Sequence, residues 1–206
     1  MKETNQKLRP SIEKENFVDL GLHVKWASCN LKAASPLERG ALYAFGETEE
    51  KSKYLFSNYK HGKNGVVYDY DVPPMFQDYA CPKKIDIEEF EDIGNISGTD
   101  MDVAHMLLGD DVRMPEEHEA EELVRLCKQQ LVEGGIRLTG PNGRSIDMPF
   151  GIFWTGTLDN DTSDPNNMFI TTKRYGRCIH VHEELGVTVS SYYRTAGVMI
   201  RPVACK

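Results

Sequence analysis

The sequence predicts an α+β fold in which two helices pack on a mainly antiparallel sheet. Many short segments alternate apolar and polar residues and are separated by Gly, Pro and Asn, which is typical of antiparallel strands joined by turns. Two stretches, residues 99–109 and 115–132, instead repeat apolar residues at helical spacing. Strands and helices do not alternate regularly, so a parallel sheet built from βαβ units is not expected.

The longer predicted helix, residues 115–132, has a strong start signal. Pro115 is tolerated in the first turn, where its missing N–H has no partner to lose. Acidic residues then crowd the positive end of the helix dipole, and basic residues come later. One buried stripe is expected along this helix, made of Ala120, Leu123, Val124, Cys127 and Leu131.

The shorter predicted helix, residues 99–109, has weaker boundaries. Thr99 or Asp100 can cap its N-terminus, because either side chain can accept a hydrogen bond from a free backbone N–H. Gly109 is expected to end the helix.

Strands are predicted before and after the helices. A hairpin turns at Gly21, and a second hairpin turns at the Asn-Gly pair of residues 142 and 143. No period persists over residues 51–98, which predicts irregular structure. The strands expected are residues 17–20, 22–30, 42–49, 136–139, 145–149, 153–157, 168–171, 177–182, 187–190 and 197–203, with turns at 173–176 and 183–186.

Length and composition favour one domain over residues 16–206, preceded by a polar tail or linker at 1–15. The chain has 206 residues, of which 40% are hydrophobic, enough for one well-buried core. Its net charge of −8, without a basic patch, argues against nucleic acid as a partner. No stretch is apolar over the length of a membrane span, and no signal peptide opens the chain, so a cytoplasmic location stays an alternative to export.

Several separated blocks resemble the Fibrobacter succinogenes major paralogous domain (FISUMP) family. Residues 17–30 are similar to the family's opening F-V-D-L-G-L-S-V-K-W-A-T-C-N, and residues 35–48 to its S-P-E-x-x-G-x-Y-F-A-W-G-E-T. Residues 113–115 match the R-M-P of its W-R-M-P-T-x-A-E block, and residues 197–203 are similar to its closing G-F-S-V-R-P-V. The blocks occur in the family's order.

The resemblance implies a C-type-lectin-like fold whose two chain ends meet in one sheet, with Trp26 and Trp154 in the core. It also implies a cell-envelope or extracellular location and a non-catalytic module that binds a glycan or a protein. Two alternatives are a formylglycine-generating (sulfatase-modifying) enzyme and a structural subunit of an envelope assembly. The closely spaced cysteine pair of the enzymatic relatives is absent here, so catalysis is not expected and no catalytic residue is proposed.

Two segments supply the candidate ligand-binding residues. The first is Asp159, Asn160 and Asp161, whose D-x-D pattern fits either a loose calcium site or an Asx-rich surface turn. It lacks the glycine and glutamate of an EF-hand loop, so no cofactor beyond this calcium alternative is expected. The second is Tyr192, Tyr193 and Arg194, which fit either anchors for a sugar or protein or ordinary loop packing.

Three further positions are weak metal candidates. Cys178, His180 and His182 alternate along one predicted strand and so share a face, with Glu183 close by. The alternative is a plain polar face opposite Ile179. No fourth ligand is evident.

The sequence has five cysteines, an odd number. Cys29 and Cys205 lie in segments that the fold would bring together, so a disulfide between them is one alternative and two free thiols the other. Cys127 is expected to be a core thiol.

The acidic stretch of residues 85–92 is interpreted as a solvated flank, and a surface for a cation or a basic partner is the alternative.

Overall fold

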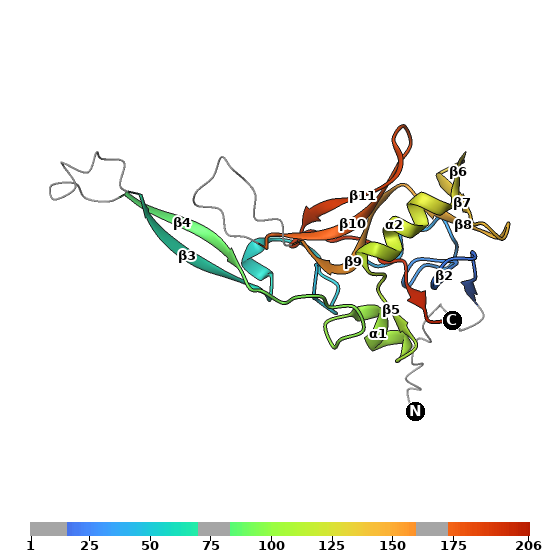
Figure 1. The fold of residues 1–206 in the computed structure, drawn as a ribbon. Helices are drawn as coiled ribbons and strands as arrows, with labels where there is room; N and C mark the ends of the chain where they lie inside the picture. Colours follow the sequence, from blue (N-terminus) through green and yellow to red (C-terminus); the bar gives the residue numbers. More distant parts are fainter. Residues whose placement is uncertain (1–15, 70–82, 160–172) are drawn as a thin grey trace, which may run out of the picture.

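The computed structural model describes residues 16–69, 83–159 and 173–206 and shows an α+β fold of mostly antiparallel sheets with two α-helices (Figure 1). The predicted tail 1–15 and strand 168–171 lie outside these residues. Neither described α-helix is long or apolar enough to cross a bilayer. The elements are β1 (Phe17–Val18), β2 (Lys25–Ala27), the 3₁₀ helix η2 (Phe56–Asn58), β3 (Gly62–Asp69), β4 (Lys83–Phe90), α1 (Val103–Leu108), β5 (Val112–Arg113), α2 (Glu117–Leu126), β6 (Lys128–Val132), β7 (Gly135–Thr139), β8 (Ser145–Pro149), β9 (Gly151–Leu158), β10 (Tyr175–His182), β11 (Gly186–Tyr193) and β12 (Val203–Ala204).

The first and last strands of the described chain share one sheet. Its order is β1-β2-β12-β5, and each neighbouring pair is antiparallel. Val203 of β12 lies opposite Trp26 of β2 and Arg113 of β5. Trp26 and Val203 are fully buried, as expected for a core position of the tryptophan. The predicted hairpin around Gly21 is confirmed, and the two ends of the domain meet in one sheet.

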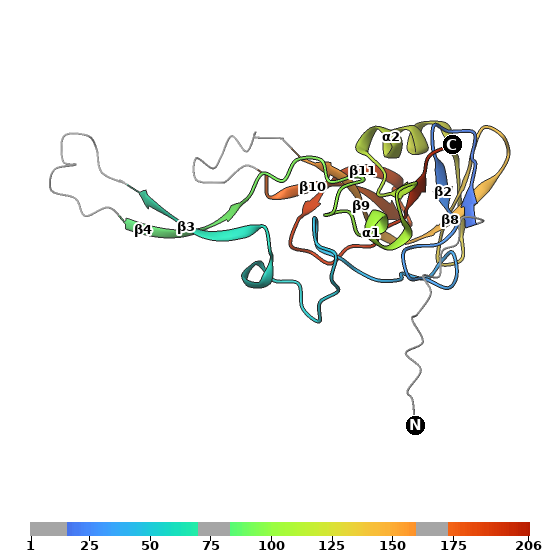
Figure 2. The ribbon, with the colours of Figure 1, turned by 90° about the horizontal axis from the view of Figure 1, so that it is seen from below.

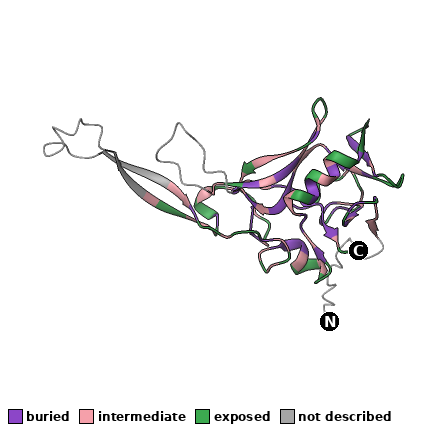
Figure 3. Ribbon diagram, viewed as in Figure 1, coloured by how far each residue is buried: buried purple, intermediate pink, exposed green. Residues whose placement is uncertain are grey.

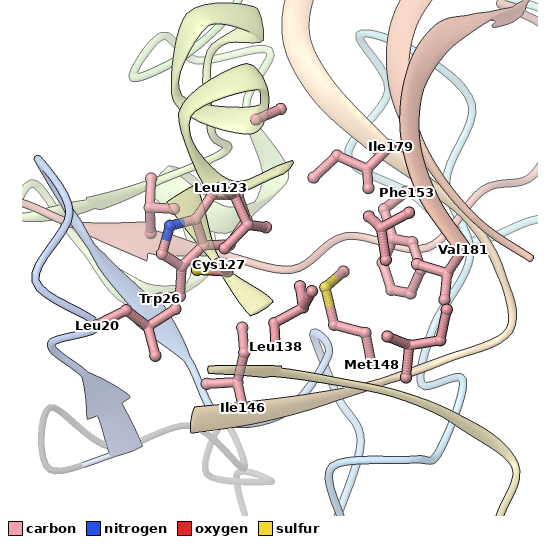
Figure 4. Packing of buried hydrophobic residues seen from close by; sticks show 14 of the residues in the cluster. Leu20, Trp26, Leu123, Cys127, Leu138, Ile146, Met148, Phe153, Ile179 and Val181 are labelled. Atoms are coloured by element: carbon pink, nitrogen blue, oxygen red, sulfur yellow. The ribbon is translucent and has the colours of Figure 1, made fainter. Parts of the chain in front are cut away.

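A second antiparallel sheet, β11-β10-β9, separates two hydrophobic clusters. The first cluster contains Phe153 and Ile179 from the sheet and Leu123 from α2 (Figure 4). The second cluster contains Trp154, which follows Phe153 in β9, and Cys178, which precedes Ile179 in β10. Because neighbouring residues of a strand point to opposite faces, both faces of this sheet are apolar where the clusters cover them. Trp154 is therefore a core residue, as predicted.

Helix α2 starts two residues later than predicted. Pro115 precedes the helix, and Glu116 is its N-cap. The N–H of Glu116 donates to Oε2 of Glu119 at 2.8 Å, which satisfies a backbone donor at the helix entrance. Leu123 and the other buried residues of α2 lie on the side that faces the core (Figure 3).

The predicted helix 115–132 is wrong beyond Leu126, where the chain turns into strand β6. β6 pairs with β7 over its whole length, and β7 pairs with β8, as predicted for the second hairpin. The side chain of Gln129 also bonds the edge of β11: its Oε1 accepts from the N–H of Val187 at 2.8 Å, and its Nε2 donates to the carbonyl of Val187 at 3.3 Å. These tertiary hydrogen bonds override the helical pattern. Leu131 is 57% exposed as a result, instead of lying on the buried stripe.

Helix α1 is also shorter than predicted, because its N-cap is Asp102 rather than Thr99 or Asp100. Oδ1 of Asp102 accepts the N–H of Ala104 at 2.9 Å, and Oδ2 accepts two further N–H groups from outside the helix. A carboxylate with this many donors fixes the start of the helix. Gly109 ends the helix with a φ of +96°, as predicted.

Residues 51–98, predicted to be irregular, contain a β-hairpin. β3 and β4 pair antiparallel over eight residues each and project away from the rest of the molecule (Figures 1 and 2). The ring of Phe90, at the end of β4, lies 5.3 Å from the ring of Phe56 and 5.6 Å from that of Tyr193. This aromatic contact attaches the hairpin to the sheet β11-β10-β9. The acidic stretch of residues 85–92 therefore includes much of a strand.

Two strands predicted near the core are largely irregular. Residues 42–49 contribute a single bridge from Tyr43 to Val198. Residues 197–203 form β12 only at their end, with a further bridge between Met199 and β9. Their backbone groups bond several different neighbours: Tyr43 donates to Val198, Phe45 to Arg194 and Met199 to Ile152, so no continuous strand forms.

Candidate binding site

The predicted aromatic pair, Tyr192 and Tyr193, lies at the end of strand β11 and not in a loop. Neighbouring strand residues point to opposite faces, so the two rings separate. The ring centre of Tyr192 is 6.4 Å from that of Trp154, and the ring centre of Tyr193 is 5.8 Å from that of Tyr175. The two tyrosines therefore do not form one patch, which corrects the prediction. Tyr192 is 41% exposed, whereas Tyr193 is half-buried.

Arg194, predicted as a third ligand contact, is fully buried. Its Nε donates to the hydroxyl of Tyr59 at 2.9 Å, and one terminal nitrogen donates to the carbonyls of Glu91 and Lys173 at 2.8 and 2.7 Å. Burial lowers the pKa of Arg194. The guanidinium lies 5.5–5.6 Å from the centres of three rings: Phe45, Tyr59 and Phe90. Arg194 therefore holds the base of the β3–β4 hairpin, and a ligand at the surface cannot reach it.

Asp159 lies in a hydrogen-bonded network on the α2 side of the sheet. The hydroxyl of Ser191 donates to Oδ2 of Asp159, and the guanidinium of Arg177 lies 3.7 Å from the same oxygen. Arg177 also donates to Ser191 at 2.7 Å and to Glu117 at 2.5 Å. The N-terminus of α2 is thereby linked to the sheet. This arrangement holds Arg177 and Ser191 rigidly beside Tyr175, which is two residues from Arg177 in β10.

The other two residues of the predicted calcium loop, Asn160 and Asp161, lie outside the described residues. Asp159 has a described position, where its carboxylate contacts a guanidinium and a hydroxyl. The calcium alternative stays a prediction.

Tyr175 is a surface residue that the sequence analysis missed. The sequence pattern predicts a turn at residues 173–176, but Tyr175 begins β10 and lies opposite Tyr193 in the register. It is 41% exposed. The signal was obscured by Gly176, which normally favours a turn. Here the glycine is required because a Cβ at this position would lie 2.6 Å from the ring of Phe45.

We call Tyr175, Tyr192 and Tyr193 the tyrosine end of β10 and β11. Burial, reinforced by the hydrogen bond from the Tyr193 hydroxyl to Glu88, raises the pKa of Tyr193 to about 12. Tyr193 is thus fixed in place and neutral at physiological pH, while the rings of Tyr175 and Tyr192 remain accessible on the two faces.

The weak metal candidates do not assemble into a site. Cys178 is buried, its sulfur lies 3.4 Å from the hydroxyl of Ser190, and burial raises its pKa. The rings of His180 and His182 are in edge contact, with centres 5.8 Å apart, at the far end of β10. Across residues 16–69, 83–159 and 173–206, no group of three or more His, Cys, Asp or Glu side chains is arranged to hold a metal ion.

Four cysteines are free thiols in the structure: Cys29, Cys127, Cys178 and Cys205. The alternative of a disulfide between Cys29 and Cys205 is therefore not realised. Burial raises the pKa of Cys127 to about 11, with Glu122 adding to the effect. Cys127 and Cys178 are poor nucleophiles for this reason, since the thiolate is the reactive form.

Comparison of the chain with models of protein families, with curated proteins and with solved structures finds no match.

Proposed function

We propose that the chain is a non-catalytic binding module of the C-type-lectin-like class that acts at the bacterial cell surface, with a glycan or a protein as its ligand. The motif resemblance supports the class and the location. The geometry supports binding through one observation: Tyr175 and Tyr192 are exposed at the same end of a sheet, on its two opposite faces, so a ligand that contacts both must reach around this end.

Exposed tyrosines on strands suit binding for a physical reason. A tyrosine side chain offers a large apolar face and a polar hydroxyl while losing little conformational freedom on contact. The backbone at this end is fixed by the β10–β11 pairing, and Arg177 is held in its ion pairs with Glu117 and Asp159. The ligand would therefore meet a surface that is organised before binding.

The motif residues that carry the resemblance have structural roles. Asn30 and Arg201, from the first and last blocks, bond each other in the core at 2.7 Å. Arg113, in the central block, forms an ion pair with Glu119. These residues stabilise the fold, so the motif carries structural information, and the ligand is set by the surface outside it.

Array binding tests the proposal. The intact chain is applied to glycan and protein arrays with and without calcium, and Tyr175→Ala and Tyr192→Ala are compared with Met106→Ala, which removes an exposed apolar side chain from α1. We expect both tyrosine variants to weaken binding about tenfold or more and the control to bind normally. Calcium-dependent binding that is unaffected by both variants would contradict a site at the tyrosine end and would favour the predicted calcium-binding residues, Asp159, Asn160 and Asp161, instead. An intact chain that binds nothing on either array contradicts the proposal.

An assembly subunit is the second candidate, because the β3–β4 hairpin projects from the body (Figure 2). Light scattering after size exclusion distinguishes the two, since a subunit would form a defined oligomer without ligand. The enzymatic alternative predicts conversion of a cysteine in a substrate peptide to formylglycine. Mass spectrometry of the incubated peptide detects that change, and we expect none.

A further inference from the structure

A hollow of about 660 Å³ lies at the opposite end of β10 from the tyrosine end. Three segments form its walls: the loop after β2, the junction of β8 and β9, and the end of β10 with the turn that follows. Its volume falls in the range of small-molecule sites, which is about 300–1,000 Å³. The side chains that line it include Arg39, Phe150, His180, His182, Glu183 and Glu184.

The charged groups around this hollow are not paired with one another. Among the described residues, no hydrogen bond or ion pair to another side chain or to the backbone involves the guanidinium of Arg39 or the carboxylates of Glu183 and Glu184, and the ring of His180 contacts the ring of His182 by its edge. A cation, two anions and an imidazole thus border one space, and the exposed Arg39, Glu183 and Glu184 can exchange water for a ligand there. A ligand placed there would meet both donors and acceptors.

His182 has a fixed orientation and tautomer in this hollow. Its Nδ1 accepts the N–H groups of Glu184 and Leu185, at 3.1 and 3.4 Å. The neutral ring therefore carries its hydrogen on Nε2, which is left as a donor. Because the Nδ1 lone pair is already used and Nε2 bears a hydrogen, neutral His182 offers no free nitrogen to a metal ion.

The charges select the class of ligand. An anion would be attracted by Arg39 but repelled by Glu183 and Glu184. A cation would be attracted by Glu183 and Glu184 but repelled by Arg39. A neutral compound with many hydroxyl groups avoids both penalties, because each hydroxyl can donate to a carboxylate or accept from Arg39 and His182. The half-buried ring of Phe150 adds an apolar wall for the C–H groups of such a compound.

We propose that this hollow binds a neutral polyhydroxylated ligand, such as a single sugar unit, through Arg39, His182 and Glu183. The site is separate from the tyrosine end and shares no residue with it. Binding at the hollow and binding at the tyrosine end can therefore be tested independently, and the loss of one does not imply the loss of the other.

The test uses the intact chain and a panel of methyl glycosides of neutral hexoses and N-acetylhexosamines. Titration is followed by the NMR resonances of the His180 and His182 rings. We expect at least one glycoside to shift both rings in a saturable manner. Arg39→Gln and Glu183→Gln should each weaken this binding about tenfold, because each removes a charge-assisted hydrogen bond.

Two kinds of control make the result specific. Arg125→Gln and Glu121→Gln change exposed residues of the same types on α2 and should leave the affinity unchanged. Tyr175→Ala should also leave it unchanged, since the tyrosine end is a different site.

Three outcomes would overturn the proposal. The first is that no glycoside of the panel shifts the histidine rings. The second is that binding weakens equally in the α2 controls. The third is that inorganic phosphate or zinc ions, and not the glycosides, shift both rings, which would assign the hollow to an ion.

Discussion

The Nε of Arg201 donates a hydrogen bond of 2.7 Å to Oδ1 of Asn30, although the two residues are 171 positions apart in the chain and both are fully buried. The other nitrogens of Arg201 donate to four backbone carbonyls, from Ala27, Ser28, Pro36 and Asp147. One guanidinium thus ties the last segment of the domain to its first loop and to β8. Burial lowers the pKa of Arg201 to about 10, so it stays charged at neutral pH.

Arg201→Lys should destabilise the fold strongly even though it keeps the charge. Lysine has three donors on one nitrogen and cannot reach five acceptors in different directions. We expect a loss of about 3 kcal/mol or more in the free energy of unfolding, measured by urea denaturation. Arg144→Lys, at an exposed turn position, is the control and should change stability by less than about 0.5 kcal/mol. Equal effects of the two substitutions would show that the buried network is not needed.

The ion pair between Arg113 and Glu119 should make stability depend on pH. Their side chains form two hydrogen bonds, of 2.6 and 2.8 Å, and Glu119 also accepts the N–H of Glu116. Burial alone would raise the pKa of Glu119, but the bonds from Arg113 and Glu116 outweigh it, and the pKa lies below its usual value of 4.5. Because the folded state favours the charged carboxylate, this stabilisation is present above the unfolded pKa and is lost as the pH falls through the folded pKa.

Glu119→Gln isolates that contribution. The variant should be less stable than the native chain by about 1–3 kcal/mol at pH 7, and the difference should shrink as the pH falls below about 4.5. Urea denaturation at a series of pH values measures it, with Glu121→Gln on the exposed side of α2 as the control. A difference that stays constant over this range would mean that Glu119 acts through packing and not through its charge.

The hydroxyl of Tyr59 connects Arg194 to the second core cluster. It accepts from Nε of Arg194 at 2.9 Å and donates to the carbonyl of Phe45 at 2.8 Å. Tyr59→Phe should therefore cost about 1–2 kcal/mol in the free energy of unfolding, since both partners are buried. Hydrogen exchange should also speed up in the nearby amides of β3. Tyr175→Phe removes an exposed hydroxyl and should have little effect on either measurement. A Tyr59 variant that behaves in the same way would contradict the assigned role.

The sequence predicted those parts of the fold in which local pattern and tertiary structure agree. The hairpin around the Asn-Gly turn, strand β9 and the core positions of Trp26 and Trp154 are confirmed because alternation and burial give the same answer there. Helix 115–132 was overextended because residues 128–132 keep a helical pattern while their hydrogen bonds go to β7. The partner strand β7 lies outside the segment in which the helical pattern is judged, so the pattern of residues 128–132 alone cannot indicate this pairing.

The candidate site was less predictable than the fold for a related reason. Arg194 was expected at the surface because arginine usually is. Two of its partners, Tyr59 and Glu91, are more than a hundred positions away in the chain. Tyr175 was missed because the neighbouring Gly176 mimics a turn, and only the packing of Phe45 reveals why a strand contains a glycine.

Asp102 offers a direct comparison between a predicted cap and the one found. Its carboxylate accepts four backbone N–H groups: those of Gly98, Ala104, His105 and Met114, at 2.7–3.2 Å. Asp102→Ala would leave all four donors without this acceptor inside the protein, so we expect a loss of about 2–4 kcal/mol in the free energy of unfolding. Asp100→Ala, at one of the two positions predicted as the cap, should have almost no effect, because Asp100 is exposed. Urea denaturation of both variants decides between the two caps, and a larger loss at Asp100 would reverse the assignment.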